Sequence, residues 1–229
     1  MRFRFDLHSH SYYSSDGVSR PEEMIAVAKS KGLDGLAITD HNNCDSVDHL
    51  LKEGLMREDG LPVDGFLMIP GVEITTAEGH LLCLGVRLPD DLKGTPAEEV
   101  CRLTHEAGGI VIPPHPYDKF RAGIRESVLE TLPLDAVEVF NAATTLDRHN
   151  RQARAYAKKR KVGMLASSDA HHASMIGTAH TLVEAEELTL SAVIKQIPKS
   201  YLTVERYQGF RACLQKTFAN VRRLARRPR

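Results

Sequence analysis

The sequence lacks the features of membrane-spanning, secreted and disulfide-stabilised proteins. No apolar run approaches the roughly 18 to 20 residues that a transmembrane helix needs. The segment from Met1 to Asp6 has no apolar core of a secretory signal. The four cysteines are far apart and form no CxxC pair, which indicates neither a disulfide framework nor a thiolate zinc site. We therefore expect a cytoplasmic protein whose cysteines are small buried side chains.

The chain also lacks net charge, but its charges are unevenly distributed. It contains 30 Lys and Arg and 30 Asp and Glu. Seven of the basic residues and none of the acidic ones lie in residues 210–229, which leaves 23 basic and 30 acidic residues before them. This asymmetry divides the chain into an acidic domain, residues 1–209, and a basic C-terminal segment, residues 210–229.

Apolar residues in the basic segment recur at intervals of three and four positions. This spacing predicts an amphipathic helix with arginines on its remaining faces. We expect the helix to pack against the acidic domain, since the charges are complementary. Attachment to nucleic acid or to a membrane surface is the alternative.

In the domain, short apolar runs alternate with helical patterns, and the domain is long enough for one large core. The order of strand, helix and strand implies parallel strands joined by right-handed crossovers. Because nearly all of the seven runs have the character of buried rather than alternating strands, they favour an α/β fold with a closed or nearly closed barrel. The runs are Phe3 to Leu7, Gly35 to Thr39, Phe66 to Ile74, His80 to Val86, Gly109 to Ile112, Ala136 to Phe140 and Val162 to Ala166.

Helix signals lie between several of these runs. Ser19 and Thr95 each precede a glutamate by three positions, which predicts capping boxes at two helix starts. Thr189 is expected to start a further helix that Pro198 ends, and residues 146–160 are expected to form another.

Histidines and carboxylates lie at the ends of several of these apolar runs. His8 and His10 are two positions apart, so in an extended chain they face the same way. Asp169 and His171 repeat this spacing after the last run. In an α/β barrel the ends of the strands meet at one mouth. Further residues of this kind are His41, Glu73 and His115.

Imidazoles and carboxylates that converge at one mouth are the ligands that borderline and hard divalent cations require. They exceed the needs of one ion, so we infer two or three ions bridged by a carboxylate. Taken singly, a histidine at a strand end is more often a hydrogen-bonded residue than a ligand. Asp16 could belong to an Asp-Gly turn or to the site, and His80 could merely begin an edge strand. We expect His49, His105 and His149 to be solvent-exposed.

Seven short motifs contain these residues in order along the chain. They are Asp6-Leu7-His8-Ser9-His10, Ser15-Asp16-Gly17, Ile38-Thr39-Asp40-His41-Asn42, Gly71-Val72-Glu73-Ile74, Pro114-His115-Pro116, Val137-Glu138-Val139-Phe140-Asn141 and Ser168-Asp169-Ala170-His171. The order of these motifs resembles the PHP family, the polymerase and histidinol phosphatase family. The similarity extends over about residues 3 to 205, and the ordered set is far more specific than one HxH pair.

The resemblance implies a distorted seven-stranded (β/α) barrel that hydrolyses phosphoesters at a di- or trinuclear centre. Glu73, Asp169 and His171 would serve catalysis, with Glu73 as the bridging ligand. Because some members have His where this chain has Asp16, manganese, iron and zinc are all compatible. The implied sets are His8, His10, Glu73 and Asp169 for one ion, Glu73, His80 and His115 for a second, and Asp16, His41 and His171 for a third.

A water shared between such ions would become the nucleophile, because metal binding can lower its pKa to about 7. A basic side chain should meet the substrate phosphate at the rim. Lys119, Arg121 and Arg125 lie close after His115, and we favour Arg121 because a guanidinium can bind phosphate bidentately.

The leading hypothesis is a metal-dependent phosphatase or phosphodiesterase of a small phosphorylated metabolite or nucleotide. One alternative is a nuclease-like enzyme that trims nucleic-acid ends and holds the polymer with its basic segment. The acidity of the domain disfavours nucleic acid across its face. A second alternative is a non-catalytic metal-binding module that serves a partner protein. The sequence does not indicate the oligomeric state.

Overall fold

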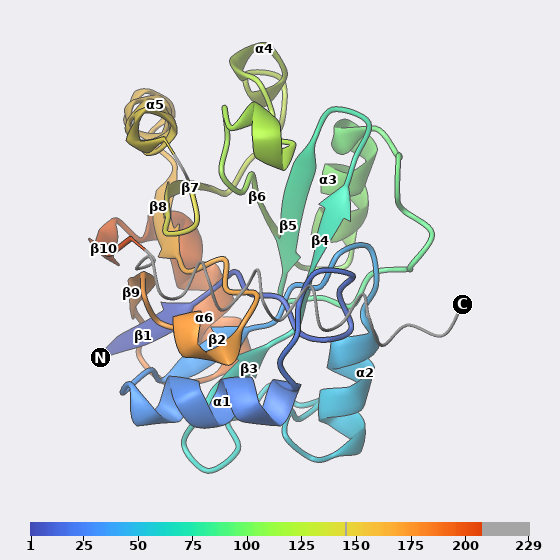
Figure 1. Cartoon of the computed structure of the whole chain (residues 1–229), viewed down its shortest axis with the longest axis vertical. Coiled ribbons are helices and arrows are strands. Elements are labelled where there is room, and N and C mark those ends of the chain that lie inside the picture. Colours follow the sequence, from blue (N-terminus) through green and yellow to red (C-terminus); the bar gives the residue numbers. More distant parts are fainter. Residues whose placement is uncertain (145, 208–229) are drawn as a thin grey trace.

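The strands of this protein form three sheets, as seen in a computed structural model that describes residues 1–144 and 146–207 (Figure 1). The sheets have the strand orders β10-β9-β1-β2-β3, β4-β5-β6 and β7-β8. The strands are β1 (Arg2–Asp6), β2 (Gly35–Ala37), β3 (Leu67–Ile69), β4 (Gly71–Thr75), β5 (His80–Leu84), β6 (Ile110–Ile112), β7 (Ala136–Asn141), β8 (Gly163–Ser167), β9 (His180–Glu184) and β10 (Leu202–Val204).

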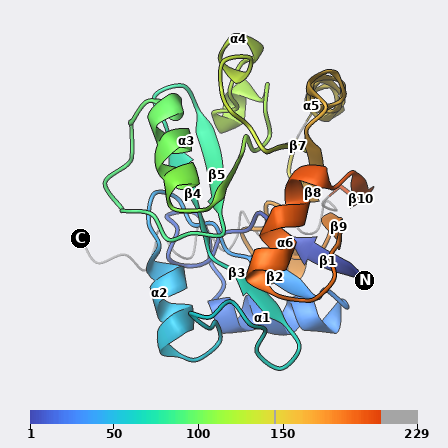
Figure 2. The same cartoon turned by 180° about the vertical axis from the view of Figure 1, so that it is seen from behind.

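Helices cover the outside of these sheets. In the view from behind, α3 lies beside β5 and β6, and α6 lies in front of the largest sheet (Figure 2). Helix α5 packs along β7, and α1 packs beside β2. The α-helices are α1 (Pro21–Ser30), α2 (Asp45–Lys52), α3 (Ala97–Glu106), α4 (Glu126–Leu129), α5 (Asp147–Arg160) and α6 (Leu190–Gln196), with short 3-10 turns at Lys119–Arg121, Ala173–Met175 and Ile197–Lys199.

Strands β2, β3, β6 and β7 are buried along their whole length, which explains their largely apolar sequences, whereas β1, β9 and β10 are partly exposed. In β5, Leu82 and Leu84 point into an inner cluster of apolar side chains, whereas Leu81 and Cys83 point into an outer cluster beneath the helices. This alternation is the two-residue period of a strand. Side chains from all three sheets meet in the inner cluster, which contains Phe5, Ala37, Ile69, Leu84, Ile112, Ala136, Leu165 and Val183 among others. One shared core therefore joins the three sheets.

The mixed α/β class is confirmed, but the seven-stranded barrel of parallel strands is not. The described strands do not close into one ladder, and β4, β5 and β6 pair antiparallel. Only residues 76–79 separate β4 from β5, a length that permits a hairpin but no helical crossover. The run from Phe66 to Ile74 breaks at Pro70, which has no N–H for a ladder, and its halves enter different sheets.

Single bridges join the sheets at the positions where the polar motifs lie. Ser9 pairs with Ala170, and His41 pairs with Glu73. Strand β9, absent from the sequence-based prediction, pairs antiparallel with β1. The carboxyl ends of β1, β2, β6 and β8 are thereby held around one central region.

The predicted capping boxes are wrong, although helices begin close to both. The Ser19 hydroxyl accepts a hydrogen bond from the backbone N–H of Ala173, and α1 begins at Pro21. The first N–H of α3 donates to Glu78 rather than to Thr95. Thr189 does cap α6, where its hydroxyl accepts from Ala192.

Three further expectations concern membrane-spanning helices, the cysteines and the C-terminal segment. Within residues 1–144 and 146–207, none of the helices has the length and apolar character needed to cross a bilayer. Cys44, Cys83 and Cys101 are buried, as predicted. The predicted helix 210–229, its boundary at residue 209 and Cys213 lie outside the described residues.

Candidate metal centre

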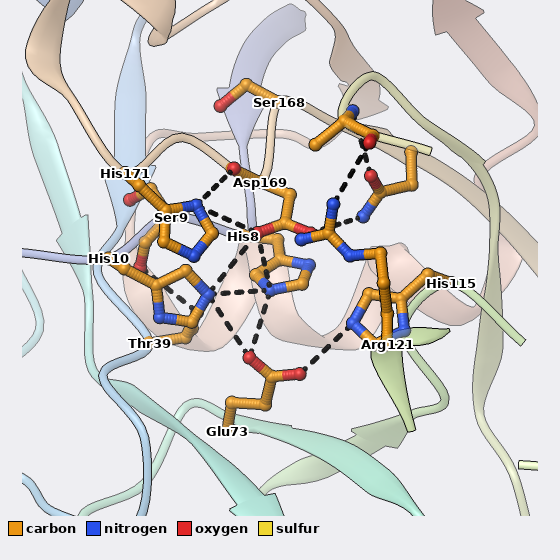
Figure 3. A network of polar contacts seen from close by, with 12 residues as sticks. His8, Ser9, His10, Thr39, Glu73, His115, Arg121, Ser168, Asp169 and His171 are labelled. Atoms are coloured by element: carbon orange, nitrogen blue, oxygen red, sulfur yellow. Dashed lines mark hydrogen bonds and ion pairs between the residues drawn. The ribbon is translucent and has the colours of Figure 1, made fainter. Parts of the chain in front are cut away.

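The structure brings the side chains of all nine predicted ligands into one cluster. Figure 3 shows part of it, with His8, His10, Glu73, His115, Asp169 and His171. Most of them follow the carboxyl ends of strands, which the shared core holds together. The nine are His8 and His10 after β1, Asp16 in the loop before α1, His41 after β2, Glu73 within β4, His80 at the start of β5, His115 after β6, and Asp169 and His171 after β8.

The carboxylate of Glu73 lies at the centre of this cluster and is fully buried. Its two oxygens are 2.7 to 3.4 Å from ring nitrogens of five histidines. Oε2 faces the nitrogens of His8, His10 and His41, and Oε1 faces those of His80 and His115. A carboxylate with histidines around both oxygens has the position that a bridging ligand needs.

Asp169 forms the second buried carboxylate of the cluster. Its Oδ1 is 3.4 Å from His10 Nε2 and 3.6 Å from both His8 Nε2 and His171 Nδ1. Its backbone has a φ of 50°, in the left-handed region, which is uncommon for residues other than glycine. Strain of this kind is concentrated at functional sites.

Asp16 points into the cluster rather than only closing a turn. Its Oδ2 is 2.8 Å from His171 Nε2 and 3.7 Å from His41 Nε2. Its side chain is 37% exposed, so it marks the solvent side of the site. Asp16, which the sequence assigned either to an Asp-Gly turn or to the site, therefore lies with the other candidate ligands.

The donor set fits divalent cations. His8 Nε2 and His10 Nε2 face each other at 3.1 Å, as two ligands of one ion would. Several buried nitrogen and oxygen atoms that could bind a metal ion have no hydrogen-bond partner among the described residues. They are His10 Nδ1, His115 Nδ1, Asp16 Oδ1 and Asp169 Oδ1. Such atoms are rare in folded proteins, since leaving them unpaired is costly. Groups whose donor atoms all lie within 4.8 Å of one another are His8, His10 and Asp169; His8, Glu73 and His115; His41, Glu73 and His80; and His10, His41 and His171.

Electrostatics in the cluster favour positive charge. Burial opposes the protonation of His8, but Asp169, Glu138 and Glu73 outweigh it and raise the pKa of His8 well above its usual value. Burial likewise opposes the protonation of His10, but the nearby carboxylates of Asp169 and Glu73 raise its pKa to about 9. Metal ions bind neutral imidazole, so ions entering the site would displace these protons.

The carboxylates show the complementary behaviour. Burial alone would raise the pKa of Glu73, but His41 and His8 hold it well below its usual range. Burial is likewise outweighed at Asp169, where Arg121 and His8 lower the pKa of the carboxyl. Both acids are thus ionised and ready to bind a cation at neutral pH.

Arg121 lies inside the site and not only at its rim. Its Nη2 pairs with Asp169 Oδ2, and its Nη1 donates to the backbone oxygen of Ala143 at 3.0 Å. The side chain is 21% exposed, so solvent reaches part of it. A phosphate that reached the cluster would meet this side chain.

Two buried polar residues of the site were not assigned a role from the sequence. Glu138 contacts His8 Nδ1 at 3.0 Å, and Asn141 donates to Asp169 Oδ2 at 2.9 Å. The signal that could have found them is a glutamate in the middle of the apolar run from Ala136 to Phe140. A charged residue there is expensive to bury unless it is paired.

The three histidines that we expected to be solvent-exposed are less exposed than predicted. His149 is buried at 6% exposure, with Nδ1 3.5 Å from Asp118, so that prediction is wrong. His49 and His105 are partly buried. His105 Nε2 lies 2.8 Å from Asp135 Oδ2, which also accepts the backbone N–H of Val111 at 2.8 Å. None of the three belongs to the cluster around Glu73.

Part of the chain matches a known family model, and a larger part is similar to a known protein. The family model described as PHP-associated matches residues 147–200. An uncharacterized protein of Methanocaldococcus jannaschii is 37% identical over 148 residues, which cover 60% of this chain and 81% of that protein. The chain belongs to the PHP family.

Solved structures share the fold at low sequence identity. PsfC from Pseudomonas syringae is 20% identical with a TM-score of 0.75, and the match covers 96% of this chain and 98% of PsfC. A two-domain protein from Bacteroides vulgatus, which contains a predicted PHP-like metal-dependent phosphoesterase, is 19% identical with a TM-score of 0.71, over 96% of this chain and 70% of that one. The lesion-specific endonuclease EndoQ from Pyrococcus furiosus has the same identity and TM-score, over 90% of this chain and 59% of the endonuclease.

Proposed function

We propose that this protein is a metal-dependent phosphoesterase that hydrolyses a small phosphorylated metabolite or nucleotide. The observation that carries this proposal is the position of Glu73, whose buried carboxylate lies 2.7 to 3.4 Å from nitrogens of five histidines. A site built in this way suits several ions that share one bridging carboxylate. The family membership and the Bacteroides vulgatus structure support the same activity.

The proposed ions would be manganese, iron or zinc. His8, His10 and Asp169 would hold one ion together with Glu73. The second would be bound by Glu73, His80 and His115, and the third by Asp16, His41 and His171. When bound, two or three such ions would supply a water of lowered pKa as nucleophile and would offset charge on the phosphate.

The side chains of this protein would orient the reaction. Glu73 and Asp169 would fix the histidines around them, and His171 contacts the Asp16 carboxylate through Nε2 at 2.8 Å and the backbone oxygen of Asp169 through Nδ1 at 2.9 Å. We assign catalytic roles to Glu73, Asp169 and His171 on this basis. Arg121 would bind the substrate phosphate, since a planar guanidinium matches two phosphate oxygens.

We expect the purified protein to contain two or three transition-metal ions per chain. The reason is that the cluster holds more nitrogen and oxygen donors than one coordination sphere uses. Elemental analysis of material prepared without chelators measures this content. One ion or fewer per chain, with no activity gained on adding manganese, would contradict a multinuclear centre.

A phosphate-release screen tests the activity itself. The substrates are mononucleotides, nucleotide bisphosphates, sugar phosphates, histidinol phosphate and a short single strand of nucleic acid, each with manganese, zinc and iron. We expect release from a small substrate. Metal binding without turnover of any substrate would instead support a non-catalytic module that serves a partner protein.

A nuclease-like phosphodiesterase is the second candidate, and two observations favour it. EndoQ shares the fold with a TM-score of 0.71, and the C-terminal segment of this chain is strongly basic. The first 209 residues carry more acidic than basic residues, which weakens the case because phosphate contacts need lysine and arginine.

Truncation after Gly209 separates the two candidates. We expect the shortened protein to be less stable, because it loses the apolar stripe of the helix that the sequence predicts there, and to retain turnover of a small phosphoester. Thermal unfolding and phosphate release measure these properties. Unchanged stability and turnover, combined with loss of salt-sensitive binding to DNA or RNA, would favour the nuclease-like candidate.

A further inference from the structure

Strand β7 contains a bulge that turns two polar residues toward the candidate metal centre. In a regular strand, residues three positions apart point to opposite faces. Glu138 pairs with Leu165 and Phe140 pairs with Ala166, so Val139 is an extra residue in β7. The bulge therefore brings Glu138 and Asn141 to the same face, where Asn141 Nδ2 donates to Glu138 Oε2 at 2.9 Å.

Both oxygens of the Glu138 carboxylate contact other groups of the protein. Its Oε1 lies 3.0 Å from His8 Nδ1, and its Oε2 accepts the backbone N–H of His115 at 2.7 Å as well as the amide of Asn141. Nδ1 is on the opposite edge of the His8 ring from Nε2, which faces Glu73 and Asp169. Glu138 is thus placed behind His8, where it cannot reach an ion held by Nε2.

Glu138 and Asn141 also hold the two left-handed residues of the site. His115 has a φ of 32°, and its N–H is the one that Glu138 accepts. Asp169 has a φ of 50°, and Asn141 Nδ2 donates to its Oδ2 at 2.9 Å. The two hydrogens of one amide group thereby connect Glu138 to Asp169. Residues in such conformations persist only when their surroundings fix them.

We propose that Glu138 and Asn141 are positioning residues of the metal centre, which bind no ion themselves but preset its ligands. This inference rests on the proposed metal-dependent function. Glu138 holds His8 in the tautomer whose Nε2 lone pair faces the cluster and keeps His115 in place. Asn141 aims Asp169. A residue that accepts the outer N–H of a metal-binding histidine also raises the basicity of that ligand.

The test compares zinc affinity in variants with a matched control. Glu138→Gln and Asn141→Ala are each expected to weaken zinc binding about 10- to 100-fold, the usual effect of removing such a partner. Competition with a fluorescent chelator measures the affinity, and thermal unfolding of the metal-free proteins measures stability. Two variants are used so that poor folding of one does not decide the result.

Asp135→Asn is the control, because Asp135 has the same contacts outside the site. It accepts from a histidine ring, that of His105, and from a backbone N–H, that of Val111. We expect Asp135→Asn to lower the unfolding temperature without changing zinc affinity. Equal losses of affinity in all three variants, or unchanged affinity in both site variants, would overturn the positioning role. Absence of zinc binding in the unaltered protein would overturn the proposed metal-dependent function instead.

Discussion

Glu73→Gln and Asp169→Asn are each expected to abolish turnover, by about 10³-fold or more in kcat/KM, or about 4 kcal/mol of transition-state stabilisation. Each change replaces a buried anionic group by a neutral group of the same shape. Glu73 would lose the charge that faces five histidines, and Asp169 the charge paired with Arg121. Steady-state kinetics on the substrate found in the screen, together with elemental analysis, measures the effect.

Glu58→Gln is the matched control for this experiment. Glu58 is exposed and lies outside the helices and strands, and the same replacement there removes one charge without touching the cluster. We expect its activity and metal content to equal those of the unaltered protein. If Glu73→Gln behaved like Glu58→Gln, Glu73 would not be a bridging ligand and the proposed centre would be wrong.

Arg121→Ala is expected to lower kcat/KM by about 10- to 100-fold while most of the metal content is retained. The guanidinium would bind the substrate phosphate through charge-assisted hydrogen bonds, and each such bond contributes about 1.5 to 3 kcal/mol. Arg121 also pairs with Asp169, so its removal takes away one partner of a candidate ligand but leaves Asn141 in place. Kinetics and elemental analysis on the same preparations separate the two roles.

Two further variants sharpen the interpretation of Arg121. Lys119→Ala removes an exposed charge from the same turn and is expected to have little effect. Arg121→Lys keeps the charge but not the planar fork, so it should restore activity only in part. A parallel fall of metal content and rate in Arg121→Ala would show that Arg121 acts through the structure of the site.

The sequence was sufficient to locate the candidate site because its residues recur in one structural position. His8, His41, His115 and Asp169 all follow apolar runs, and the ends of buried strands are brought together by the core that those runs form. Local order along the chain therefore predicted proximity in space. Which atoms face one another, such as Glu73 Oε1 and His80 Nδ1, depends on side-chain geometry that no spacing contains.

The strand directions and helix starts were less predictable, because contacts distant in the sequence decide them. Pro70 divides one apolar run between two sheets, which the composition of the run does not indicate. Ser19 has the sequence of a helix cap but is used by the backbone of Ala173, 154 residues away. In the sequence, Glu138 only interrupts an apolar strand. Its role becomes clear from its contacts with His8 and His115 in the structure.

The antiparallel pairing of β1 with β9 determines when the protein can finish folding. Arg2 lies opposite Glu184, so β1 has no partner on that side until β9 has been synthesised. Contacts of such long sequence separation form slowly, because the intervening chain must first be ordered. His8 and His10 directly follow β1, whereas Asp169 and His171 are synthesised shortly before β9. A product that ends before β9 therefore leaves one edge of β1 unpaired, next to His8 and His10 of the candidate metal centre.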